Sequence, residues 1–141
     1  MPARGAKPKP PGQAVTRHAG LDWTEVPDVP FTGGPQLRPN RRNGKPWPEA
    51  AKRKWAAWST MPHAATWTEA DWEFAFDSIE IAAAMMGGFD QEPVVQYASE
   101  LRNREKVMGT TADYRRDIRV RYTDPPSGTA KVVGLDDYRN L

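Results

Sequence analysis

The side chains that most often carry catalysis or hold metals are few in this sequence and poorly spaced for either task. The 141 residues contain no cysteine, which excludes disulfides, zinc–cysteine sites, iron–sulfur clusters and a cysteine nucleophile. The two histidines, His18 and His63, have no carboxylates at metal-ligand spacing beside them. His63 is therefore interpreted as a polar or packing residue between two helices. Because no Walker-type glycine loop is present either, we expect no enzyme, no metal and no cofactor.

One row of carboxylates has helical spacing and consists of Glu69, Glu73, Asp77 and Glu80. Such a row is able in principle to hold a divalent cation. A solvated face or an interface is the simpler interpretation, because charged rows on helices usually face solvent. The row therefore predicts a surface rather than a metal site.

Basic residues indicate a different chemistry, the neutralisation of phosphates. The net charge is only +2, but residues 1–46 carry eight Lys/Arg against three Asp/Glu, and a second basic cluster lies at 115–121. Basic arms bind nucleic-acid phosphates without sequence specificity, and that binding weakens with salt. A solubilising or ion-paired surface is the alternative. The candidate DNA-binding residues are Lys7, Lys9, Arg38, Arg41, Arg42, Lys45, Arg115, Arg116 and Arg119.

Three segments of different composition must position these side chains. Residues 1–46 hold nine of the 14 prolines, which predicts a basic, largely disordered arm whose apolar islands at 21–23 and 26–31 are able to dock on a folded body. Residues 47–123 form the predicted helical domain for oligomerisation and DNA binding. Residues 124–141 form a short tail, in which weak patterns predict a strand over 131–134 and a helix over 135–141.

Four helices are predicted in the central segment, over 49–59, 69–86, 94–108 and 112–122. Pro48 favours the start of the first helix, which leaves Lys52, Arg53 and Lys54 mostly toward solvent. Thr68 and Thr111 are good caps for the second and fourth helices. Glycines at 87 and 109 end the second and third helices. The predicted fold is therefore all-α, a small domain of about four helices.

The second helix is apolar on two opposed faces. Trp72, Ala75, Phe76, Ile79, Ala83 and Met86 form one stripe, and Phe74, Ile81 and Met85 form the other. Because both faces must be covered, one is expected to meet its own domain and the other a second subunit, with burial inside a single chain as the alternative. The candidate oligomerisation residues are Trp55, Trp58, Trp72, Phe74, Ile81 and Met85.

Several short motifs follow one another along the chain: Trp23-Thr24-Glu25-Val26-Pro27, Phe31-Thr32-Gly33, Trp47-Pro48, Trp55-Ala56-Ala57-Trp58, Trp67-Thr68-Glu69-Ala70-Asp71-Trp72, Glu100-Leu101-Arg102, Gly109-Thr110-Thr111 and Arg115-Arg116-Asp117-Ile118-Arg119. In this order and spacing, they resemble phage terminase small subunits of the P27 type from phages of actinobacteria. The family often has leucine and proline around the last capping threonine, where this chain has Thr110 and Ala112. The tail after 124 matches no motif of the family.

The resemblance implies a ring-like homo-oligomer without catalytic residues. Such a protein recognises the packaging site on viral double-stranded DNA and regulates the terminase large subunit, which carries the ATPase and the nuclease. Two other interpretations stay open: a virion structural adaptor at the head–tail connector, and a helix-turn-helix regulator whose turn lies at Gly109. No stretch approaches the roughly 18 apolar residues that span a bilayer, so we expect a protein of the host cytoplasm without membrane contact.

Overall fold

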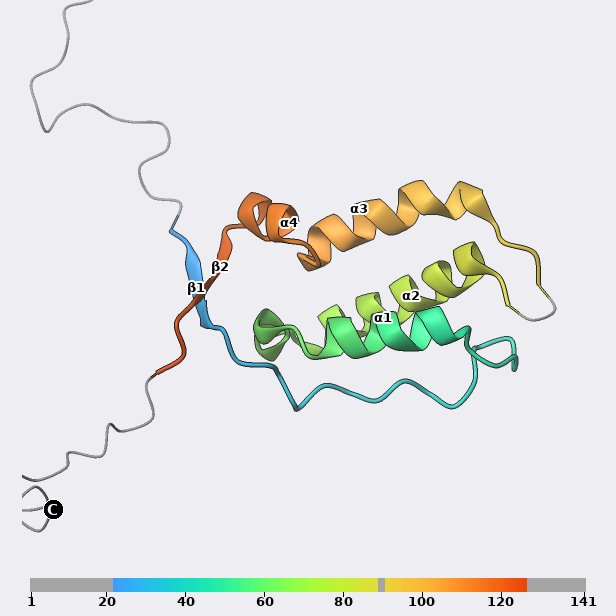
Figure 1. Ribbon diagram of the computed structural model, residues 1–141, viewed down its shortest axis with the longest axis horizontal. Helices are drawn as coiled ribbons and strands as arrows, with labels where there is room; N and C mark the ends of the chain where they lie inside the picture. Colours follow the sequence, from blue (N-terminus) through green and yellow to red (C-terminus); the bar gives the residue numbers. More distant parts are fainter. Residues whose placement is uncertain (1–21, 89–90, 127–141) are drawn as a thin grey trace, which may run out of the picture.

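A computed structural model describes residues 22–88 and 91–126 of the chain (Figure 1). The elements follow the order β1 (Thr24–Pro27), α1 (Glu49–Ser59), η1 (Pro62–Thr66), α2 (Glu69–Met86), η2 (Val95–Tyr97), α3 (Ala98–Met108), α4 (Ala112–Asp117) and β2 (Val120–Thr123), where η marks a 3₁₀ helix. The prediction of a mostly helical fold with four α-helices is confirmed. Within the described ranges, no helix is long and apolar enough to cross a membrane. The tail segments predicted at 131–134 and 135–141 lie outside the described residues.

Helix α1 has the predicted bounds, and one face of it is buried. Ala51, Trp55 and Trp58 recur at helical spacing and lie at 0%, 4% and 3% exposure. The helix ends where the Thr60 hydroxyl donates to the Ala56 carbonyl at 2.8 Å. Pro62 then opens the short η1 turn.

Helix α2 also has the predicted bounds, because both of its ends carry strong local signals. At its start, the Thr68 hydroxyl accepts a bond from the Asp71 amide at 3.4 Å, and the Asp71 carboxylate accepts one from the Thr68 amide at 2.8 Å. This reciprocal capping box satisfies two donors that a helix start leaves unpaired. At its end, Gly87 adopts a φ of +70°, and a Cβ there would lie 2.6 Å from the Gln91 carbonyl oxygen. Only glycine fits this turn without strain.

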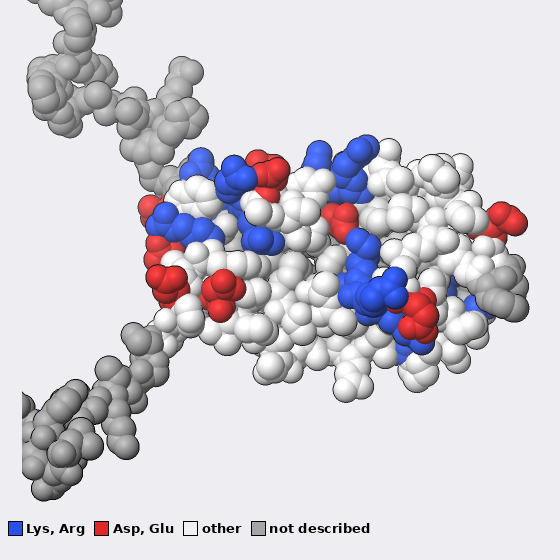
Figure 2. Space-filling view, in the orientation of Figure 1, with Lys and Arg blue, Asp and Glu red and all other residues white. Residues whose placement is uncertain are grey.

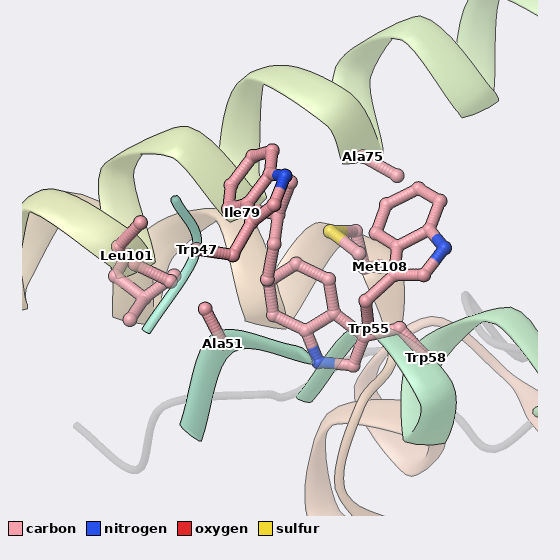
Figure 3. Close-up of a cluster of buried hydrophobic side chains, with 10 residues drawn as sticks. Trp47, Ala51, Trp55, Trp58, Ala75, Ile79, Leu101 and Met108 are labelled. Carbon is pink, nitrogen blue, oxygen red and sulfur yellow. The ribbon is translucent and has the colours of Figure 1, made fainter. Parts of the chain in front are cut away.

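The core lies where α1 and α3 pack against α2 (Figure 3). Five residues of α2 are fully buried there, and three of them are alanines: Ala75, Ser78, Ile79, Ala82 and Ala83. Their small side chains let the neighbouring helices approach closely, and the large rings of Trp47, Trp55 and Trp58 fill the remaining space together with Leu101 and Met108. Both sides of α2 are therefore at least partly covered within one chain.

The last two helices differ from their predicted bounds. The helix predicted over 94–108 begins with the tight turn η2, and its regular part starts at Ala98. The helix predicted over 112–122 is wrong at its end, because α4 stops at Asp117. Arg119 then adopts a φ of +58°, a left-handed conformation that no helix continues through. Residues 120–123 are extended instead of helical.

The expectation of a purely helical fold needs a second correction, a small sheet. Strands β1 and β2 pair in parallel, with Thr24 opposite Val120 and Pro27 opposite Thr123. Flanking bonds of 2.8 Å join the Thr24 amide to the Arg119 carbonyl and the Asp28 amide to the Thr123 carbonyl. The pair brings the beginning and the end of the described chain side by side at one end of the helices (Figure 1).

Residues 22–46, the described part of the predicted arm, lie along the helices. The ring of Phe31 stacks on Trp72 with 6.2 Å between ring centroids. The indole of Trp55 donates to the Pro35 carbonyl at 3.1 Å, and that of Trp47 donates to the Arg38 carbonyl at 2.8 Å. The segment lacks regular helix, as its proline content predicts, but these indole donors give its backbone fixed partners. In this part of the chain the arm is therefore held and not free.

Candidate nucleic-acid interface

The residues that the sequence predicts for DNA binding do not gather in one place. Lys7 and Lys9 lie outside the described residues. The remaining seven form two groups. Arg38, Arg41, Arg42 and Lys45 belong to the segment that runs beside α2, whereas Arg115, Arg116 and Arg119 lie on or just after α4.

The side chain of Arg41 is bonded to other residues within the fold. Its side chain is only 8% exposed, and its Nε lies 3.2 Å from the Glu80 carboxylate. Its Nη1 donates to the Gln91 side-chain oxygen at 2.8 Å. An arginine that is buried and bonded on two sides fixes the 22–46 segment to α2, so it does not offer its charge to phosphates.

Arg42 and Arg38 remain on the surface beside it. Arg42 contacts Asp77 at 2.7 Å, with both side chains about half exposed at 51% and 50%, and this hydrogen bond raises the pKa of the guanidinium further. Arg38 lies over the Phe76 ring at 5.9 Å from its centroid. Lys45 is half-buried and also has an interaction partner. Of this group, Arg38 and Arg42 are the most accessible to a polyanion.

Two carboxylates of the acidic row on α2 have partners in the 22–46 segment. Glu80 is paired with Arg41, and Asp77 is paired with Arg42. Across the described ranges, no group of three or more His, Asp or Glu side chains is arranged to hold a metal ion. Half of the row therefore serves to bind the 22–46 segment.

Arg115 points back into the fold. Its guanidinium lies over the ring of Tyr122, 4.6 Å from the centroid, and its Nη1 donates to the Gly109 carbonyl at 3.2 Å. A cation over an aromatic face, bonded to a backbone oxygen, stabilises the junction between α3, α4 and β2. Its charge contributes to the local field, but its donors already have partners.

Arg116 and Arg119 do not form the predicted basic row with Arg115. Arg116 lies on α4, is 69% exposed and pairs with Asp113 one turn before it. Arg119 lies beyond the end of the helix and has its own interaction partners. Arg116 is thus the one exposed member of the predicted triplet on α4, and exposed pairs of this kind exchange partners at little cost.

His63 is buried where the η1 turn, the end of α3 and strand β2 meet. It is 3% exposed, and its Nε2 lies 2.7 Å from the Met108 carbonyl oxygen, which only accepts hydrogen bonds. Nε2 therefore carries the proton, and Nδ1 accepts from the Tyr122 hydroxyl at 2.6 Å. Burial lowers the pKa of His63, the bond to Met108 opposes that change, and the charge of Arg115 adds to the lowering. With both nitrogens engaged, the ring joins the η1 turn to the end of α3 and to β2.

The residues predicted for oligomerisation separate into buried and partly exposed ones. Trp55 and Trp58 belong to the chain's own core, with only 4% and 3% of their surface exposed. Trp72 is half-buried between Phe31 and Trp67. The remaining three, Phe74, Ile81 and Met85, are half-buried against the core.

An apolar hollow of about 230 Å³ lies between α2 and α3, on the side of Phe74. Trp67, Phe74 and Met108 line it, and Val107 stands at its edge with 66% of its surface exposed. Arg104 covers part of Phe74 at 4.8 Å from the ring centroid. This hollow is a candidate for contact with another copy of the chain.

The structure also reveals cations to which the sequence patterns gave no role. Arg53 on α1 and Arg102 and Lys106 on α3 are exposed, and no ion pair to a carboxylate is found for them within the described ranges. The spacing of Arg102 and Lys106, four residues apart on one helix face, was the available signal. Their relation to α1 depends on tertiary packing, which the sequence does not display.

Comparison with known proteins gives one match. A family model described as phage terminase small subunit matches residues 3–141, nearly the whole chain. No curated protein and no solved structure matches it. The narrower resemblance to the P27 type stays a prediction.

Proposed function

We propose that this chain, which belongs to the phage terminase small subunit family, binds viral double-stranded DNA at the packaging site and regulates the terminase large subunit. Its work is then non-covalent: it marks the DNA and delivers it to the subunit that carries the ATPase and the nuclease. The protein acts in the host cytoplasm, where viral genomes are packaged.

The observation that carries this proposal is the extent of the family match, from residue 3 to residue 141. The match includes the basic arm, the helices and the tail, so it supports the proposal for the chain as a whole. The exposed cations of the described part agree with it, because phosphate contacts supply most of the affinity of such proteins for DNA.

Assembly into a homo-oligomer is part of the proposal. In its described part, each copy presents few unpaired cations, so one copy alone would bind DNA weakly. Several copies joined to one another bind the same duplex at many points, and the effective concentration of each later contact rises. The hollow beside Phe74 and Val107, together with Ile81 and Met85 on α2, is the surface we assign to contacts between copies.

The proposal is tested with the full-length protein and the large subunit of the same phage. We expect a defined oligomer by light scattering, salt-sensitive binding to duplex DNA, and a changed ATPase rate of the large subunit when the small subunit is added. Assembly without DNA binding and without any effect on the large subunit would instead favour a virion structural adaptor. A stable dimer that binds one operator sequence would favour the helix-turn-helix regulator.

A further inference from the structure

Helices α1 and α3 both lie on the face shown in Figure 2, and an open groove runs between them. An open hollow of about 450 Å³ lies along it, lined by Lys54, Ala57, Trp58, Met61, Glu105, Thr110 and Thr111. Two of the lining residues, Ala57 and Thr111, are exposed. Basic side chains appear over both α1 and α3 on this face (Figure 2).

The cations of the groove come from both helices. Arg102 and Lys106 are one turn apart on α3 and therefore share a face. Lys54 on α1 reaches across to Glu105 of α3 at 2.8 Å, which shows that these two helix flanks face each other. Arg53 adjoins Lys54 on the solvent side of α1 and is exposed.

The groove is not neutralised by its own carboxylates. Across residues 22–88 and 91–126, Arg53, Arg102 and Lys106 have no ion pair, and Arg102 touches only the Ser99 hydroxyl at 3.5 Å. Neighbouring cations on the same helices differ from them, because Lys52 is paired with Glu49 and Arg104 with Glu100. Lys54 lines the hollow itself, with Glu105 as the one lining carboxylate within those ranges, and Arg53, Arg102 and Lys106 are exposed on the two helices beside it.

We propose that this groove, with Lys54 in its lining and Arg53, Arg102 and Lys106 exposed on the helices that flank it, is a track for the phosphates of duplex DNA. The inference rests on the proposed DNA-binding function and names where on the helical domain the backbone of the duplex lies. Long flexible cations on both sides of a hollow neutralise successive phosphates without reading bases, and they add to the basic arm as a second, fixed binding surface.

An acidic protein segment fits the groove less well. Protein interfaces depend on exposed aromatic and aliphatic anchors. In the described ranges the exposed large apolar side chains are Trp23, Val29, Val95, Tyr97, Val107 and Ile118, and none of them lines this groove. Trp58 does line it, but with only 3% of its surface exposed. The chemistry of the groove is therefore that of a phosphate site.

Glu105 has a distinct role under this proposal. It holds Lys54 across the groove, with the two side chains 18% and 27% exposed, and its own charge repels an entering phosphate. DNA must therefore compete with Glu105 for Lys54. Removal of this carboxylate is expected to strengthen DNA binding, an effect that a general loss of structure does not produce.

The experiment measures binding of the full-length protein to a mixed-sequence DNA duplex by fluorescence anisotropy over a series of salt concentrations. The double variant Arg102→Ala, Lys106→Ala should bind more weakly, and its slope of log affinity against log salt should fall by about 1.8, which is about 0.9 for each phosphate left without its cation. Lys106→Ala alone should show about half of that decrease. Lys52→Ala is the matched control, because Lys52 is also exposed but is paired with Glu49 outside the groove.

The second arm compares Glu105→Gln with Glu100→Gln, an exposed carboxylate of the same helix that is paired with Arg104. Glu105→Gln should bind DNA several-fold more tightly, with a smaller change in Glu100→Gln. Thermal unfolding of every variant verifies the fold.

If the wild type binds DNA and the double variant keeps its affinity and salt slope, the groove is not the track, while the proposed function stands. If the wild type does not bind DNA at low salt, both fail. If the variants keep their affinity for DNA but no longer bind the large subunit, the groove binds protein and the inference is overturned.

Discussion

The imidazole of His63 and the hydroxyl of Tyr122 lie 2.6 Å apart although 59 positions separate them in the sequence. The other ring nitrogen donates to the Met108 carbonyl oxygen at 2.7 Å. One neutral ring therefore joins the η1 turn, the end of α3 and strand β2. Because both nitrogens are in use, the side chain has little freedom to change its protonation without breaking a contact.

The first prediction concerns pH. Burial lowers the pKa of His63 in the folded state below its usual value near 6.5, so the unfolded chain binds a proton first as the pH falls. The stability that His63 contributes is present above that value and is lost as the pH drops below it. Urea unfolding at about pH 7.5 and about pH 5.5 should show a larger loss of stability for the wild type than for His63→Gln. Equal losses in the two proteins would contradict the assignment.

The second prediction concerns the buried pair of Arg41 and Glu80. Removal of one partner leaves the other charge buried and unpaired, so Arg41→Met and Glu80→Leu should each cost about 3 kcal/mol in the free energy of unfolding. The double variant should cost less than the sum of the two, because it removes both charges together. Chemical unfolding of the wild type, the two single variants and the double variant measures the four free energies of this double-mutant cycle. Strict additivity would show that the pair does not hold the 22–46 segment to α2.

The third prediction concerns the basic arm, which contains the candidate residues Lys7 and Lys9. A chain that starts at residue 22 keeps every contact of the described fold, and it should unfold at the same temperature as the full-length protein. Its affinity for duplex DNA should fall at low salt, with a smaller salt slope, because four cations, Arg4, Lys7, Lys9 and Arg17, have been removed. An unchanged slope would show that this part of the arm does not contact DNA.

The fourth prediction concerns assembly through the hollow between α2 and α3. Val107 is 66% exposed at its edge, so Val107→Asp should alter the stability of one isolated copy by no more than about 0.5 kcal/mol. If copies meet at this hollow, the buried charge should reduce the mass of the oligomer measured by light scattering. Val95→Asp is a suitable control, because Val95 is 76% exposed and lies in η2, before the start of α3 and away from the hollow. A reduced mass in both variants, or in neither, would place the contact elsewhere.

The sequence predicted the elements whose signals are local. Helix α2 was found at both ends because Thr68, Asp71 and Gly87 act within a few residues of the backbone that they satisfy. The strand pair was not predicted, because its two strands are far apart in the sequence. Glu25 and Arg121, which are bonded across the pair, lie 96 positions apart. Four-residue strands without clear alternation carry no pattern that separates them from loops.

The same reason explains why the sequence does not show which of the predicted cations are accessible. Arg41 and Arg115 look like accessible cations in the sequence, where neither Glu80 nor Tyr122 is near them. Whether an arginine meets solvent or a distant partner is decided by tertiary packing. Conversely, Arg53, Arg102 and Lys106 lie among ordinary charged helix positions, and only the packing of α1 and α3 against α2 brings them to the two sides of one groove.

The parallel pairing of β1 and β2 has a mechanical consequence. The chain enters the pair at the start of β1 and leaves it at the end of β2, so these two points lie at opposite ends of the strands. Opposite pulls on residues 22 and 126 act along the strand axis and load the hydrogen bonds of the pair together, in shear, instead of opening them one by one. Tension between a partner held by the first residues and another held by the last ones would pass through this short pair. The helices, which lie outside that line of force, would keep their arrangement while it acts.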